Sequence, residues 1–337
     1  MAVIPTSKPA AEARRRLVLR AAAATLGLPG LALSARAAVA DGRPVSLVVS
    51  YPAGGGADLV ARLLAPRMAA ALGQTVVVEN KPGASGQLAA AHVARATPDG
   101  TTLLLDASSF AVNPSLFARL PYDTDAAFAP LAVVALFPNV LVCTPSFEAR
   151  SVGDVVRLAR SRPGQLAYAS SGNGSAQHLA GALFEVQAKV DLLHVPYKGG
   201  GPALNDVMAG QVPLFFANVA SSLGHIQSGK LRPLAVTSRI RARALPNVPT
   251  MEEAGVPGYE VNEWNPILAP AGVPAATRTA LQVAIRKAID DPEVLGRIRA
   301  LSGEVFDASN DGALQAFLAA QRKQWARIVR ERRISVD

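Results

Sequence analysis

VSLVVSYPAGGGAD, residues 45–58, decides the fold class of this chain. Its aliphatic start predicts a strand over Val45–Ser50, and its glycine-rich second half predicts the loop that leads into a helix beginning near Asp58. Two more β-rich runs, TVVVE (75–79) and TTLLLD (101–106), follow with a helical stretch between them. A β-α-β-α-β unit of this kind is typical of a parallel sheet with helices on its faces.

A second series of the same kind begins after Cys143, with predicted strands at 166–170, 192–196, 212–217 and 231–238. The C-terminal part returns to helices, and the stretch WNPILAP (264–270) before them is read as the chain crossing back. We therefore expect an α/β protein with two doubly wound lobes around a ligand cleft. Lobe one comprises residues 41–145 plus 263–337, and lobe two comprises residues 146–262.

Residues 1–40 have the composition of an export signal. Arg14 and Arg15 head a basic stretch, and the apolar run that follows, Ala21–Leu33, is shorter than the roughly 20 residues that a spanning helix needs. The arginine pair resembles a twin-arginine signal, and an ordinary secretory signal remains the alternative. Cleavage is expected after Ala40 or after Ala37. Export predicts a periplasmic protein.

The charge of the chain does not favour nucleic-acid binding. The formal net charge is +9, but residues 1–40 contribute +5 of it, and the remaining +4 is scattered without a basic block interleaved with aromatic residues. The single cysteine, Cys143, lies in the apolar stretch NVLVC and is expected to be a core residue. The four histidines lack metal-ligand spacing, so we expect no metal site.

Two glycine-rich loops follow predicted strands and lead into helices. The first, AGGGAD, offers backbone N–H groups from Gly55 to Asp58, and the second, SSGNGS (170–175), adds serine hydroxyl groups. Ligands of open parallel sheets bind beyond the carboxyl ends of the strands, where helix N-termini favour anions. Two such loops facing each other suit a carboxylate. The alternative for each loop is a tight turn in which glycine only supplies special backbone dihedrals.

Neighbouring residues allow two interpretations each. Tyr51, just before the first glycine loop, is either a wall of the ligand site or a core aromatic residue. Lys81 and Lys198 either add positive charge near the cleft or are solvated loop lysines. His178, in the first turn after SSGNGS, either touches the ligand or is a packed or exposed helix histidine.

The competing function is that of an exported dinucleotide-dependent oxidoreductase. Gly54 and Gly56 follow the first strand, and Glu79 ends the second strand about twenty residues later. However, Leu59 occupies the position of the third glycine of that fingerprint. A serine hydrolase is not favoured, because SSGNGSAQ has Gln177 where the last glycine of G-x-S-x-G belongs.

The motifs along the chain resemble one family, the extracytoplasmic solute receptors of tripartite tricarboxylate transporters, also called the Bordetella uptake gene family. The matching segments include YPAGGGADLVARLLA, VVVENKPGASGQLAA, LAYASSGNGSAQHLAG, HVPYKGGGPALNDVMAGQV and LPNVPTMEEAGVPGYE, in order along nearly the whole chain. The resemblance implies a type II periplasmic-binding-protein fold that closes around a small carboxylate. It also implies a receptor that is not an enzyme and needs no cofactor.

The resemblance further implies which residues contact the ligand. Those of lobe one would be Gly55, Gly56, Ala57, Asp58 and Ser108, with the ring of Tyr51 as a wall, and those of lobe two would be Ser170, Gly174, Ser175 and Asn218. The implied partners are the membrane permease subunits of such a transporter or a sensor kinase, with the receptor itself a monomer. Ala57 stands where the family often has threonine, and Asn265–Pro266 stand where an aromatic residue and glycine are common. The sequence leaves the identity of the carboxylate open.

Overall fold

The computed structural model describes Met1, residues 42–306 and residues 311–334. Apart from Met1, the predicted export signal lies outside the described residues, so its prediction is untested. Residues Val39–Asp337 belong to one compact unit. Among its described helices, none is both long enough and apolar enough to cross a membrane.

The first part of the sheet is built on the stretch VSLVVSYPAGGGAD, residues 45–58. β1 (Val45–Val49) lies between β2 (Val76–Asn80) and β3 (Thr102–Leu105), and the three strands are parallel. The register pairs Val49 with both Asn80 and Leu105, so the carboxyl ends of the strands lie at one edge. The glycine loop leaves β1 at this edge, as the sequence predicts.

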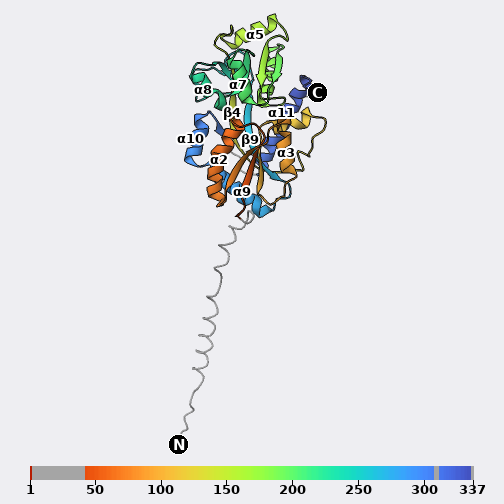
Figure 1. Ribbon diagram of the computed structural model, residues 1–337, viewed down its shortest axis with the longest axis vertical. Coiled ribbons are helices and arrows are strands. Elements are labelled where there is room, and N and C mark those ends of the chain that lie inside the picture. Colours follow the sequence, from red (N-terminus) through yellow and green to blue (C-terminus); the bar gives the residue numbers. More distant parts are fainter. Residues whose placement is uncertain (2–41, 307–310, 335–337) are drawn as a thin grey trace. The chain divides into compact units, whose positions relative to one another are not determined.

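Helices cover both faces of this first part (Figure 1). They are α2 (Gly56–Leu72), the 3₁₀ turn η3 (Ala84–Gly86), α3 (Gln87–Ala94), α9 (Ala275–Ile289) and α10 (Pro292–Ala300). α2 packs against α9. Their apolar faces and the strands form a buried cluster that includes Leu47, Leu64 and Ile285. The first lobe is therefore a layered α/β unit, as expected.

Two long antiparallel strands connect the two parts of the sheet. β9 (Asn262–Pro270) pairs with β3 and with β4 (Phe128–Cys143), and the last residues of β4 pair with strands of the second part. The sequence indicates a strand only at NVLVC, because Pro130 and Pro138 interrupt the pattern. The pairing of β4 with β9 shifts register after Pro130 and again between Val133 and Leu136, whereas Pro138 pairs with Asn262 in regular register.

The second part of the sheet repeats the arrangement. β7 (Leu214–Asn218) pairs with β4 and, in parallel, with β5 (Ala167–Ser170), which pairs in parallel with β6 (Leu193–Pro196). β8 (Arg232–Val236) pairs with β4 on its other side. The helices are α5 (Val152–Ser161), α6 (Ala176–Ala188), α7 (Gly200–Met208) and α8 (Val219–Gln227).

The C-terminal helix α11 (Asp311–Glu331) packs against both lobes. It contacts α4 (Ser109–Leu116) of the first lobe and α6 of the second. One apolar cluster accordingly contains Val112, Leu183 and Trp325 together. Beyond α11, the guanidinium of Arg332 lies 2.8 Å from the carboxylate of Glu185. The short strand β10 (Glu304–Val305) pairs with β4. The lobe boundaries at 145/146 and 262/263 stay predictions.

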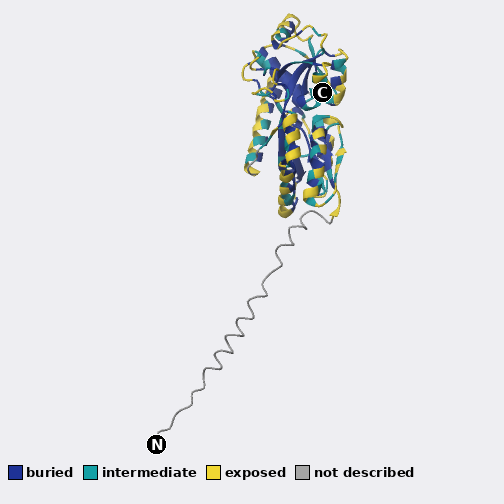
Figure 2. Ribbon diagram, turned by 90° about the vertical axis from the view of Figure 1, so that its left-hand side faces the viewer, coloured by how far each residue is buried: buried dark blue, intermediate teal, exposed yellow. Residues whose placement is uncertain are grey.

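Burial confirms the sequence interpretation of the core. The strands are largely buried, and exposed residues gather on the outer faces of the helices (Figure 2). Cys143 is fully buried at the end of β4, as expected for a core residue. His178 is also buried, and its Nδ1 accepts a hydrogen bond from the backbone N–H of Gly174. Burial lowers the pKa of His178 to about 3, so this packed histidine is neutral at pH 7.

Candidate ligand-binding site

A small pocket lies where loops from the two lobes face each other. Its volume is about 40 Å³, and it lies beyond the carboxyl ends of β1, β5 and β7. Its lining consists of loop and helix-start residues together with three residues from the strands β7 and β9: Tyr51, Pro52, Ala53, Gly55, Gly56, Ala57, Ala107, Ser171, Ser175, Ala176, Gln177, Gly200, Gly201, Pro202, Phe215, Asn218, Ser221 and Glu263. This set contains no lysine and no arginine.

Four helices begin at this pocket. The residues that cap their N-termini are Gly55 for α2, Ser175 for α6, Gly199 for α7 and Asn218 for α8. First-turn N–H groups have no partner within their own helix, and the helix dipole adds positive potential at the same end. Four such ends around one small space favour the binding of an anion without help from a lysine or arginine side chain.

Two of these helix starts are fixed by side-chain caps. The Oγ of Ser175 accepts a hydrogen bond from the backbone N–H of His178 at 3.3 Å and donates to the carbonyl oxygen of Gly172 at 2.7 Å. The Oδ1 of Asn218 accepts from the N–H of Ala220 at 2.8 Å. Serine and asparagine are favoured caps because their short side chains reach these N–H groups. The caps hold the first turns of α6 and α8 in place at the pocket.

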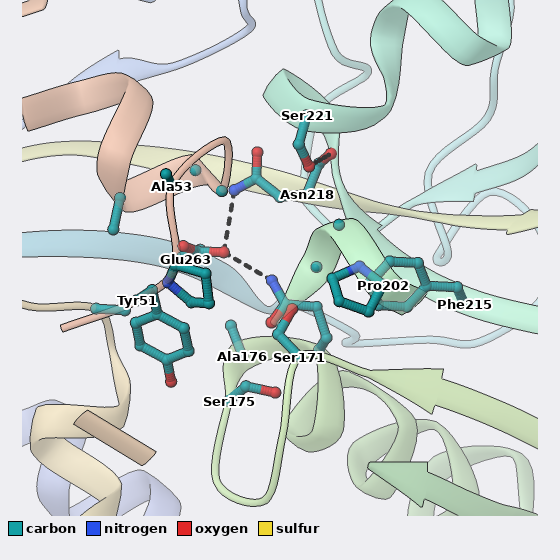
Figure 3. Close-up of a pocket in the computed structure, with 18 residues that line it drawn as sticks. Tyr51, Ala53, Ser171, Ser175, Ala176, Pro202, Phe215, Asn218, Ser221 and Glu263 are labelled. Atoms are coloured by element: carbon teal, nitrogen blue, oxygen red, sulfur yellow. Dashed lines mark hydrogen bonds between the residues drawn. The ribbon is translucent and has the colours of Figure 1, made fainter. Parts of the chain in front are cut away.

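A carboxyl group, which the sequence analysis did not identify, also lines the pocket. Glu263 on β9 is 7% exposed, and its Oε2 accepts hydrogen bonds from Gln177 Nε2 at 2.7 Å and from Asn218 Nδ2 at 3.0 Å (Figure 3). Burial raises the pKa of Glu263, and the two amide hydrogen bonds oppose that effect. No local signal marks Glu263, because its partners are 86 and 45 positions away.

The structure brings six of the predicted contact residues to the pocket. They are Tyr51, Gly55, Gly56, Ala57, Ser175 and Asn218. The ring of Tyr51 lies on the wall, with its hydroxyl directed away from Glu263 in Figure 3. The starts of α7 and of β9, which the sequence analysis did not assign to ligand binding, complete the lining.

The other four predicted residues do not line the pocket, and their role as ligand contacts stays a prediction. The carboxylate of Asp58 accepts from the N–H of Gly54 and from the guanidinium of Arg62. The Oγ of Ser170 lies 2.7 Å from His194 Nε2. Ser108 is buried directly before α4. Gly174 has a left-handed φ of 74°, and a Cβ added to it would lie 2.6 Å from Leu116 Cδ2.

A larger hollow of about 570 Å³ adjoins the pocket. Both share Tyr51, Pro52 and Ser171 in their linings, and the loop Pro82–Gly86 and Lys198 line the larger one. Lys198 is exposed, whereas Lys81 lines neither hollow. In the described part of the chain, no group of three or more histidine, cysteine, aspartate or glutamate side chains is placed to hold a metal ion.

Comparison with known proteins decides the family. The profile of the family described as "Tripartite tricarboxylate transporter family receptor" matches residues 60–334 of this chain. This chain belongs to that family. Receptors of the family are solute-binding proteins of the periplasm, and they are not enzymes. The resemblance recognised in the sequence is therefore confirmed, and the oxidoreductase alternative finds no support.

Three solved structures of similar proteins confirm the fold, and one of them is described as a periplasmic binding protein. The periplasmic binding protein BugD is 36% identical, with a TM-score of 0.83 over 88% of this chain and 99% of that one. Rpa4515 of R. palustris with adipate is 34% identical, with a TM-score of 0.83 over 87% and 98%. MatC of Rhodopseudomonas palustris with bound malate is 32% identical, with a TM-score of 0.80 over 85% and 99%.

Proposed function

We propose that this chain is an exported periplasmic receptor that binds a small organic acid through its carboxylate and catalyses no reaction. The observation that carries the proposal is the convergence of four helix N-termini on one pocket whose lining includes no lysine or arginine. Backbone N–H groups and helix dipoles then supply the attraction for the anion. The ligands named for two similar proteins, adipate and malate, are carboxylates.

Binding would couple to closure of the lobes. The starts of α2 and of α6 belong to different lobes, so a carboxylate held by both joins the two lobes. The ligand thereby stabilises the closed form over an open one. The rest of the ligand would extend towards the larger hollow, because the two spaces share lining residues. No cofactor is needed for this cycle.

The closed receptor would deliver its ligand to the permease subunits of a tripartite tricarboxylate transporter, or report it to a sensor kinase. Residues 1–40 would direct export and be removed, and the receptor would act as a monomer. Family membership and the basic, then apolar, N-terminal sequence support this arrangement.

The test is the melting temperature of the purified protein against mono-, di- and tricarboxylates, aromatic acids and acidic amino acids, with NAD included. A ligand at a hundredfold its dissociation constant adds about 2.7 kcal/mol to the free energy of unfolding, which shifts the midpoint measurably. We expect a shift with one class of carboxylate. A shift with NAD alone would refute the receptor proposal, as would the absence of binding to every carboxylate tried.

Gly56→Ala locates the binding. A Cβ at Gly56 would lie 3.2 Å from Asn218 Nδ2 and 3.3 Å from Glu263 Oε1, so the methyl group intrudes into the pocket. We expect the carboxylate-induced shift to fall sharply while the ligand-free melting temperature changes little. Gly153→Ala, near the start of α5, is the matched control. A Cβ at Gly153 would lie 3.7 Å from its nearest neighbouring atom, Ser151 Oγ, so this variant should keep the full carboxylate-induced shift in melting temperature. Equal shifts in the two variants would place the ligand elsewhere.

A further inference from the structure

The carboxyl group of Glu263 has one oxygen engaged and one free. Oε2 accepts from the amides of Gln177 and Asn218, whereas Oε1 accepts no hydrogen bond from the described residues. Oε1 faces the first residue of α2, since a Cβ built on Gly56 would lie 3.3 Å from it. The free acceptor therefore sits beside the helix start that we propose as a carboxylate site.

The two amide groups cannot exchange their donor and acceptor ends without losing other bonds. Asn218 Oδ1 is used as the cap of α8, where it accepts from Ala220, so its Nδ2 must face Glu263. Gln177 Nε2 donates to Asn139 Oδ1 at 3.1 Å as well as to Glu263 Oε2, and a reversed amide would bring Gln177 Oε1 against the carboxylate oxygen. Both groups consequently present N–H donors to Oε2 in any liganded state that keeps these contacts.

The lining offers Oε1 no cation, because it contains neither lysine nor arginine. A free carboxylate oxygen next to an anion site repels a plain carboxylate, and it attracts a ligand that brings its own hydrogen-bond donor. A site that is built to accept such a donor discriminates against the analogue that lacks it, since the buried acceptor is then left unpaired.

Resting on the proposed function, we propose that Glu263 is a specificity-determining residue. It selects carboxylic acids that carry an ammonium or hydroxyl group on the carbon next to the carboxylate, that is, 2-amino or 2-hydroxy acids. The carboxylate binds at the start of α2, and the neighbouring donor meets Glu263 Oε1. Burial, which raises the pKa of Glu263, adds to the need for a donor partner when the group is ionised.

Glu263→Gln tests this directly, because it reverses the polarity of the free atom. The two fixed amide donors hold the new carbonyl oxygen in the place of Oε2, so the new NH₂ group faces the pocket. The probes are matched sets: propionate, lactate and alanine; succinate, malate and aspartate; and glutarate, 2-hydroxyglutarate and glutamate. Dissociation constants are measured by calorimetry for the full chain and for the variant.

We expect the unaltered protein to bind a substituted acid at least tenfold more tightly than the matched plain acid. Glu263→Gln should weaken the affinity for the substituted acid by about tenfold or more and change the affinity for the plain acid little or not at all. Glu260→Gln, on the same segment but paired with Arg239 outside the pocket, should keep the original ratio.

The outcomes separate the two proposals. The role of Glu263 is overturned if the unaltered protein prefers the plain acids. It is also overturned if Glu263→Gln leaves the ratio of the affinities for substituted and plain acids unchanged. The receptor function stands in both cases. Because the preference of the unaltered protein is itself a readout, the test holds even if the variant does not fold. Failure of every carboxylate in the wider melting panel overturns the receptor function, and this inference with it.

Discussion

At the scale of single residues, burial shapes the charge state of Asp106. It is fully buried after β3, and its Oδ1 accepts hydrogen bonds from Ser50 Oγ and from the N–H of Ala107 at 2.7 Å. Its Oδ2 has no hydrogen-bond partner among the described residues. Burial raises the pKa of Asp106 to about 7 and outweighs the hydrogen bonds that lower it.

The raised pKa predicts a loss of stability with rising pH. Folding favours the protonated form of Asp106, so its stabilising contribution is present below about pH 4 and is lost as pH rises towards 7. The loss amounts to at most about 4 kcal/mol. Asp106→Asn mimics the protonated acid and should remove this dependence. Urea unfolding between pH 4 and pH 8 checks it, and a constant difference between variant and parent would contradict the assignment.

At the scale of elements, the serine caps of α6 and α5 allow the effect of a cap on stability to be distinguished from its effect on ligand binding. Ser175→Ala removes the cap of α6 and a hydroxyl group of the pocket, so we expect a stability loss of about 1 kcal/mol and roughly tenfold weaker carboxylate binding. Ser151→Ala removes the cap of α5, far from the pocket lining. It should cost similar stability and leave affinity unchanged.

Urea unfolding and calorimetry of the two variants provide the comparison. If Ser151→Ala weakened carboxylate binding as much as Ser175→Ala, the weaker binding of the Ser175 variant would come from general destabilisation of the protein. The account of the pocket requires that only the cap at the pocket affects the dissociation constant.

The elements that the sequence predicts well are those with local signals. The run Val45–Ser50, the glycine loop and Ser175 before α6 each follow from neighbouring residues, and the structure places them as expected. β4 is not predictable at its full length, because its prolines interrupt the strand pattern and its pairing partners β7, β8 and β9 are distant in sequence. Glu263 is missed for a related reason, since its partners Gln177 and Asn218 are 86 and 45 positions away in the sequence.

At the scale of the whole molecule, loops of the two lobes contact each other across the cleft. The Oγ of Ser85, in the first lobe, donates to the carbonyl oxygen of Asn173, in the second, at 2.6 Å. Gly199 lies against the ring of Pro52, where an added Cβ would be 3.0 Å away. These contacts join loops across the mouth of the cleft.

Ser85→Ala should therefore weaken carboxylate binding about fivefold, because it removes a hydrogen bond that exists only between closed lobes. Ser161→Ala, which removes a bond within α5 alone, should leave affinity unchanged. Calorimetry gives the affinities, and small-angle scattering should show a smaller radius of gyration on ligand addition. Identical scattering with and without ligand would contradict closure on binding.

The most direct test of the central claim is a crystal structure of the protein with the carboxylate found in the melting panel. The account predicts the carboxylate between the lobes, within hydrogen-bond distance of backbone N–H groups at the starts of α2 and α6. A carboxylate held instead by arginine or lysine side chains outside this pocket would contradict it.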